Sequence, residues 1–143
     1  MLIVGIDPPK GIAAIDENGK IVKMLTAKDT SGIFEWLNDN KQAIKKVYIE
    51  QPWGVGTKRG RGKSVGVQKR IAANVGQSYQ KSMSIGSFCK AMKIPYELVH
   101  PNKILTKMDK RLFHKMTGWT DRSNEHNRDA AVLIWHKYGR LKL

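Results

Sequence analysis

The chain has 143 residues, of which 41% are hydrophobic, so it is long enough for one domain with a core and too short for two ordinary domains. It carries 26 Lys and Arg against 12 Asp and Glu, a formal net charge of +14. Its single cysteine, Cys89, excludes an intramolecular disulfide and a cysteine-rich zinc site, and we expect an inert thiol on a helix. Without an apolar run of ~18 residues or the basic start of a signal peptide, we expect a soluble intracellular protein.

The first part of the chain predicts a meander, a helix and a parallel strand. A turn signal at Glu17-Asn18-Gly19 separates two strands of the meander. Thr30 or Ser31 can cap a helix that ends near residues 38–40. Residues 46–50 then return as a strand parallel to the first, because a helical crossover separates them. The three strands of the meander are expected over residues 1–7, 11–16 and 20–25.

The middle of the chain predicts a loop, a long helix and a fifth strand. Residues 52–66 carry glycines and basic residues in irregular order, which is typical of an exposed loop. A long helix is expected from about residue 67 to 92, where Gly86 either weakens the helix or marks close packing against the sheet. The fifth strand is expected over residues 94–99.

Two more helices complete the predicted elements. A basic helix is expected over residues 103–116, and Ser123 or Asn124 can cap a last helix that runs to about Tyr138. The order of elements predicts one layered α/β domain. We expect a five-stranded mixed sheet, with three antiparallel strands followed by parallel strands, flanked by helices.

The positive charge is concentrated in the middle of the chain. Between Gln51 and Lys93 there are nine basic residues and no acid. Such a field recruits polyanions, because neutralising phosphates releases condensed counterions. The alternative is a solvated basic face, although solubility does not require an acid-free half-chain. The nine residues are Lys58, Arg59, Arg61, Lys63, Lys69, Arg70, Lys81, Lys90 and Lys93.

Two acids stand out because each ends an apolar strand that is followed within two residues by a proline. They are Asp7, after Leu2-Ile3-Val4-Gly5-Ile6, and Glu50, after Val47-Tyr48-Ile49. In α/β sheets the ligand crevice lies outside the carboxyl ends of parallel strands, so neighbouring strands place the two acids side by side. Two close carboxylates repel unless a cation lies between them, which predicts a site for a hard metal ion.

The last helix adds Asp129, with His126 at i−3 and Glu125 at i−4 on neighbouring helix faces. Ala130 and Ala131 follow and would let this helix approach the sheet closely. Such a site suits one or two Mg²⁺ or Mn²⁺ ions about 4 Å apart, which would activate a water and stabilise the leaving oxygen of a phosphodiester. Three roles stay open for His126: metal ligand, general base, or a residue that simply helps begin the helix.

Three motifs span nearly the whole chain: Ile3-Val4-Gly5-Ile6-Asp7-Pro8, Tyr48-Ile49-Glu50-Gln51, and residues 126–131 with Asp129 followed by two alanines. In these motifs the chain resembles RuvC-type Holliday junction resolvases of the RNase H-like superfamily, in particular a short phage-type member. The resemblance implies one RNase H-like nuclease domain over residues 1–143. It also implies that the protein is located in the cytoplasm of a bacterial host or phage-infected cell.

The resemblance assigns roles to the acids. Asp7 and Glu50 would be the first two catalytic, metal-binding acids, and Asp129 the last. Family members carry Asp or His three residues before that last acid, so His126 takes the role by position. Glu125 is then a bystander or an outer metal ligand. The implied cofactor is Mg²⁺ or Mn²⁺, as one or two ions.

The resemblance also points to residues that would contact nucleic acid. The family places an aromatic residue three positions after its glutamate, where it stacks on an unpaired base at the crossover, and Trp53 stands there. Base stacking contributes about 1–3 kcal/mol per base. The alternative is that Trp53 covers the sheet edge. Lys103, and in a looser register Lys107 or Lys110, resemble the basic residues at the scissile phosphate.

The function implied by the resemblance is metal-dependent, structure-selective cleavage of four-way and other branched DNA by paired nicks. A homodimer would present two sites whose twofold matches that of the junction. We expect the dimer contact on the long helix, where Tyr79, Met83 and Phe88 would leave apolar surface. The expected contacts to nucleic acid are Trp53, Lys58, Arg59, Arg61, Lys63, Lys69, Arg70 and Lys103, with Lys103 also counted among the catalytic residues.

Two alternatives stay open from the sequence. One is an RNase H-like nuclease that acts on RNA or RNA–DNA hybrids, for which the same acids would serve. The other is a non-catalytic basic DNA-binding module, which has no need of clustered acids. The chain also departs from the family, because Pro9-Lys10 stands where glycine commonly follows Asp-Pro.

Overall fold

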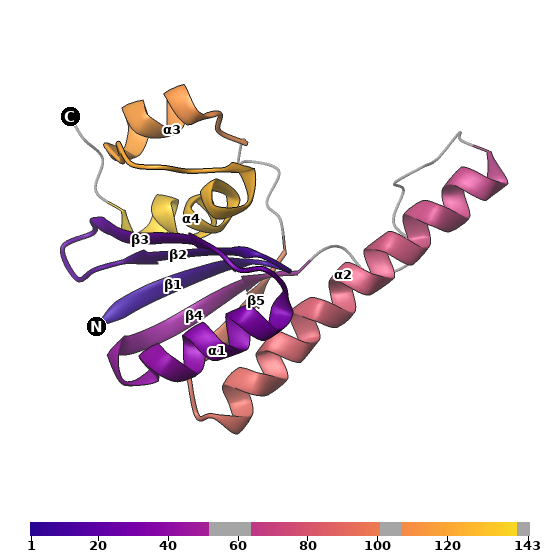
Figure 1. Ribbon diagram of the computed structural model, residues 1–143, viewed down its shortest axis with the longest axis horizontal. Helices are drawn as coiled ribbons and strands as arrows, with labels where there is room; N and C mark the ends of the chain where they lie inside the picture. The colour runs from indigo at the N-terminus through magenta and orange to yellow at the C-terminus, as the bar shows by residue number, and fades with distance from the viewer. Residues whose placement is uncertain (52–63, 101–106, 140–143) are drawn as a thin grey trace.

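The computed structural model describes residues 1–51, 64–100 and 107–139, without the side chains of residues 68, 71, 72, 74 and 75 (Figure 1). One mixed sheet has the strand order β3-β2-β1-β4-β5. β1 and β2 pair antiparallel, as do β2 and β3, whereas β4 lies parallel to both β1 and β5. The predicted α/β class and mixed five-stranded sheet are confirmed. The strands are β1 (Leu2–Asp7), β2 (Gly11–Ile15), β3 (Ile21–Thr26), β4 (Ile44–Glu50) and β5 (Tyr96–Val99).

Helices connect these strands in the order that the sequence predicts, with one short 3-10 helix added before β4. In the described parts of the chain, none of the helices is both long and apolar enough to cross a membrane. The helices are α1 (Thr30–Asn40), η1 (Lys41–Ala43), α2 (Val65–Ala91), α3 (Lys110–Thr117) and α4 (Glu125–Tyr138).

Three helices begin at residues other than the predicted ones. Asp29 caps α1, one residue before the predicted Thr30, and Ser64 caps α2, which therefore starts two residues early. Asp109 caps α3, so the prediction of a helix running continuously from residue 103 is wrong. Asp and Ser side chains satisfy the free amides of a first helical turn, which fixes these starting points.

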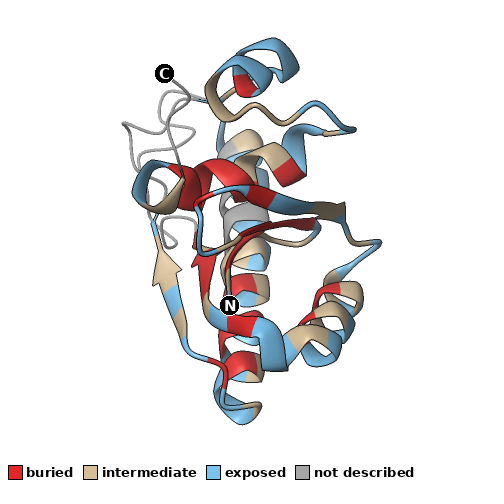
Figure 2. Cartoon of the chain, turned by 90° about the vertical axis from the view of Figure 1, so that its left-hand side faces the viewer, coloured by how far each residue is buried: buried red, intermediate tan, exposed pale blue. Residues whose placement is uncertain are grey.

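The strands β1, β2 and β4 are largely buried between two layers of helices, whereas the edge strands β3 and β5 are more exposed (Figure 2). Ile3 and Tyr48 belong to the core formed with α4. Val4 and Ile49 belong to the core formed with α1 and α2. β1 and β4 are therefore the central strands that their continuous apolar sequences predict.

Two glycines let α4 lie directly against the sheet. A Cβ atom at Gly5 would lie 2.2 Å from the backbone oxygen of Ala130, and one at Gly11 would lie 2.2 Å from the backbone oxygen of His126. Ala130 and Ala131 are fully buried, which confirms the close approach predicted for them. The start of α4 is thereby held beside the end of β1.

α2 packs on the sheet through its C-terminal part, while its N-terminal part extends past the strands (Figure 1). A Cβ atom at Gly86 would lie 3.0 Å from the Tyr96 ring, so this glycine does mark close packing. Burial raises the pKa of the Cys89 thiol to about 11, as expected of an inert thiol. Phe88 stacks on Phe34 with ring centroids 4.8 Å apart, so its assignment to free apolar surface is wrong.

Candidate active site

Asp7 and Glu50 lie side by side at one edge of the sheet. β1 and β4 are parallel neighbours in which Ile6 pairs with Ile49, so the next residue of each strand is an acid. Glu50 is among the groups that raise the pKa of Asp7, so the two carboxyl groups lie close together. The predicted juxtaposition of the two acids at the carboxyl ends of parallel strands is confirmed.

The surroundings of Asp7 favour its protonated form. Burial is the largest cause, followed by the hydrogen bond with Glu50 and the charges of Glu50 and Asp129, and together they raise the pKa of Asp7 to about 9. The positive charge of Lys107 opposes this shift. The raised pKa favours a protonated Asp7 beside Glu50 when no cation is bound.

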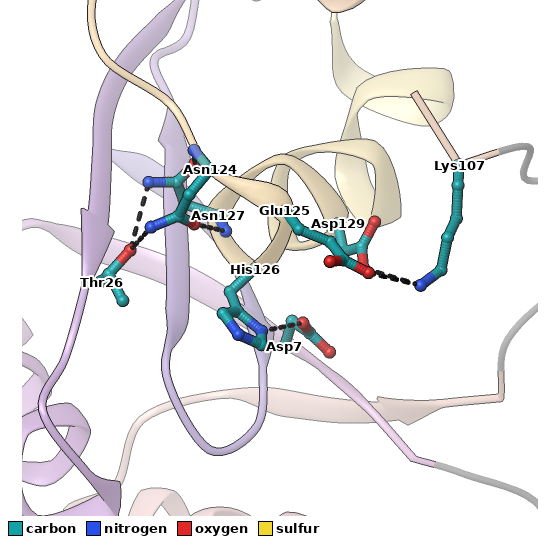
Figure 3. A network of polar contacts seen from close by, with 8 residues as sticks. All are labelled: Asp7, Thr26, Lys107, Asn124, Glu125, His126, Asn127 and Asp129. Carbon is teal, nitrogen blue, oxygen red and sulfur yellow. Dashed lines mark hydrogen bonds and ion pairs between the residues drawn. The ribbon is translucent and has the colours of Figure 1, made fainter. Parts of the chain in front are cut away.

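A network of amide and hydroxyl groups fixes the start of α4 on the end of β3 (Figure 3). Asn124 and Asn127 form a reciprocal capping box, each side chain accepting a hydrogen bond from the backbone amide of the other. Both side-chain amides also donate to the Thr26 hydroxyl, at 2.6 Å from Asn124 and 3.3 Å from Asn127. The prediction that Asn124 can cap the last helix is confirmed. The part that Thr26 and Asn127 play in this network could not be recognised in the sequence.

This network places His126 next to Asp7. The imidazole Nδ1 lies 3.6 Å from Asp7 Oδ2, and about half of the His126 side chain is exposed (Figure 3). A separation of 3.6 Å is too long for a hydrogen bond but short enough for an ion pair if the ring is protonated. The capping hydrogen bonds of α4 come from Asn124 and Asn127, so they account for the helix start without the His126 side chain.

Asp129 and Glu125, on the first turns of α4, both face Lys107. Lys107 Nζ lies 2.9 Å from Glu125 Oε1 and 3.8 Å from Asp129 Oδ2 (Figure 3). Burial, opposed by Lys107 and reinforced by the charge of Glu50, raises the pKa of Asp129. The Lys107 ammonium lowers the pKa of the exposed Glu125. Lys107 thus supplies a positive charge to the outer side of the acidic group.

The acidic group combines donors from two strands and a helix, and we call Asp7, Glu50, His126 and Asp129 the acidic site. Carboxylate oxygens and an imidazole are donors that Mg²⁺ or Mn²⁺ accepts in proteins. In the described conformation, no three acidic, His or Cys side chains of the described residues converge closely enough to hold one ion. The donors are of the kind that a hard cation takes, but Asp129 is paired with Lys107 and Asp7 is approached by His126.

The remaining predicted residues are only partly described. Lys69 and Arg70 are exposed on the part of α2 that extends past the sheet. Lys107, which the sequence favoured less than Lys103, is the lysine that reaches the acids in the described residues. The predicted residues outside the described ranges are Trp53, Lys58, Arg59, Arg61, Lys63 and Lys103.

No protein-family model matches the chain, and no curated protein sequence matches it. What points to function is the position of the acids, the raised pKa of Asp7 and the positive charge of the chain.

Proposed function

We propose that this chain is a metal-dependent, structure-selective endodeoxyribonuclease with an RNase H-like fold, which resolves four-way and other branched DNA junctions by paired nicks as RuvC-type enzymes do. One observation carries the proposal. Asp7 and Glu50 end two adjacent central parallel strands, and Asp129 faces them from α4. A protein of net charge +14 has no structural need to gather carboxylates at one sheet edge.

Asp7, Glu50, Asp129 and His126 would hold Mg²⁺ or Mn²⁺, and Glu125 is an outer candidate. When bound, the ion would activate a water and stabilise the leaving 3′ oxygen of the phosphodiester. The residues of the chain prepare for this in two ways. Asp7 would release its proton when the ion binds, and His126, with Nδ1 3.6 Å from Asp7 Oδ2, would serve there as a metal ligand or as a general base.

Lys107 lies beside the acidic site and would contact the DNA substrate. Three quarters of its side chain is exposed, while its ammonium group reaches both Glu125 and Asp129. A lysine ammonium is a compact charge that binds phosphate oxygens. In the proposed complex Lys107 turns from Asp129 to the scissile phosphate and leaves the carboxylate free for the metal ion.

The extended part of α2 is the proposed surface for the arms of the junction. Lys69 and Arg70 are exposed there, and contacts of such residues to phosphates release counterions without selecting a sequence. A homodimer would present two such surfaces and two acidic sites. Its proposed contact includes Tyr79 and Met83 of α2, and a monomer mass that stays constant at micromolar protein would contradict the dimer.

The test of the proposal is cleavage of a labelled, immobile four-way DNA junction with Mg²⁺, Mn²⁺ or EDTA, by the wild-type protein and Asp7→Asn. An RNA–DNA hybrid in parallel reactions separates a resolvase from an RNase H-like enzyme of another specificity. Tight junction binding without cleavage in any metal would leave a non-catalytic DNA-binding module. Nicks that require both a divalent ion and Asp7 are the expected result.

A further inference from the structure

A serine of α2 is bonded to the strand that carries Glu50. Ser82 is fully buried, and its hydroxyl lies 2.8 Å from the backbone carbonyl oxygen of Glu50 and 3.1 Å from that of Ser78. A hydroxyl has one proton to donate, and the shorter contact is the one to Glu50. A serine inside a helix commonly bonds only to the carbonyl four residues earlier, as the exposed Ser84 does with Gln80 at 2.8 Å.

The bond lies where β4 ends. Glu50 is the last residue of β4, and the amide of Gln51 donates to the carbonyl of Val99 on β5 at 2.8 Å. The side-chain amide of Gln51 lies 3.5 Å from the sulfur of Met83. Two consecutive residues of α2 therefore contact the end of β4: Ser82 contacts Glu50, and Met83 contacts Gln51, the residue that follows the strand.

We propose that Ser82 is a positioning residue of the acidic site, a role that rests on the proposed function. The direction of the Glu50 carboxylate follows from the backbone of Glu50, because the allowed side-chain rotamers depend on the backbone angles. Ser82, on α2, fixes that backbone because its hydroxyl donates a hydrogen bond to the carbonyl oxygen of Glu50. Without the hydroxyl, the carbonyl must turn toward another donor, and the carboxylate turns away from Asp7 with it.

The position of Ser82 also links two parts of the proposed enzyme. The same continuous helix carries Lys69 and Arg70 toward the proposed DNA surface and Ser82 toward Glu50. Loss of the Ser82 hydroxyl should weaken metal binding and leave the phosphate contacts of the extended part of α2 in place. A general weakening of the structure would impair both.

The experiment measures binding of Mn²⁺ alone by isothermal titration calorimetry to wild type, Ser82→Ala and Ser84→Ala. Groups that orient the ligands of a metal ion change its affinity about 10–100-fold when removed, and we expect the low end, about tenfold weaker binding, for Ser82→Ala. Ser84→Ala loses a hydroxyl of the same helix that bonds only within α2, and we expect wild-type affinity. Junction affinity in EDTA should be equal for all three proteins.

Ser82→Thr, which keeps the hydroxyl, should recover most of the Mn²⁺ affinity. If Ser82→Ala melts below the assay temperature, Ser82→Cys offers a near-isosteric side chain with a weak donor and should show the same loss. Equal Mn²⁺ affinity for the Ser82 and Ser84 variants would overturn the positioning role while wild type still binds Mn²⁺. Absence of Mn²⁺ binding by wild type itself would instead contradict the proposed function.

Discussion

The carboxyl groups of Asp7 and Glu50 lie next to each other at the ends of two adjacent parallel strands. Such a pair cannot be fully ionised at this distance unless a positive charge joins it, and in the metal-free protein a proton fills that need. A divalent cation would replace the proton and allow both groups to ionise. Proton release and metal binding should therefore be linked at this site.

The stability of the metal-free protein should fall as the pH rises. The pKa of Asp7 is raised from its ordinary value of 3.8 to about 9, so the folded chain holds a proton that the unfolded chain loses. Stability thus decreases with pH between these two values, because the native state binds more protons in that interval. Urea unfolding in EDTA between pH 6 and 9 measures the slope.

Asp7→Asn removes the ionisation and should flatten this dependence. At pH 8 in EDTA we expect the variant to be more stable than wild type by more than about 1 kcal/mol, since wild type must take up a proton at Asp7 on folding and the amide does not. Glu35→Gln, an exposed change on α1 at the opposite face of the sheet, should keep the wild-type slope. Parallel pH profiles for wild type and Asp7→Asn would show that Asp7 is ionised in the folded protein.

Removal of Lys107 should strengthen binding of the metal ion. Its ammonium pairs with Asp129 and Glu125 and competes with a cation for those oxygens. For Lys107→Met we expect Mn²⁺ to bind several-fold more tightly by calorimetry. Lys110→Met removes the same charge from the first residue of α3, so it controls for the change in net charge. Weaker Mn²⁺ binding by Lys107→Met than by the control would contradict this competition.

A side chain at Gly5 should force α4 off the sheet. The added Cβ of Gly5→Ala would lie 2.2 Å from the backbone oxygen of Ala130, which no rotamer change can relieve. Overpacking of this kind costs about 1–3 kcal/mol or more, measured by urea unfolding. Gly66→Ala is the matched control, because its Cβ meets nothing within 4 Å and alanine favours the helix. Equal stabilities would mean that α4 does not depend on this contact.

The sequence predicts the sheet and the two central acids well, because both follow from local patterns. Continuous apolar runs identify β1 and β4 as buried strands, and an acid before a proline marks each end. Parallel register then brings Asp7 and Glu50 together. The spacing of His126 and Asp129 on one helix likewise needs no tertiary information.

The features that the sequence does not predict depend on contacts between distant residues. The close approach of Gly5 to Ala130 joins residues far apart in the chain, and so does the bond from Ser82 to Glu50. Lys107 pairs with Glu125 and Asp129 because the chain folds back to place it beside α4. Phe88 has an apolar side chain of the kind that a dimer surface would use, yet α1 covers it through Phe34.

Nicking of a labelled four-way junction shows whether the acidic site cleaves DNA. Wild type, Asp7→Asn and the surface control Glu35→Gln are compared in Mg²⁺, Mn²⁺ and EDTA, with an RNA–DNA hybrid as a second substrate. We predict paired nicks in the junction by wild type and Glu35→Gln, and none with Asp7→Asn or in EDTA. Nicks of equal rate with Asp7→Asn, or no cleavage by wild type in either metal, would contradict the claim.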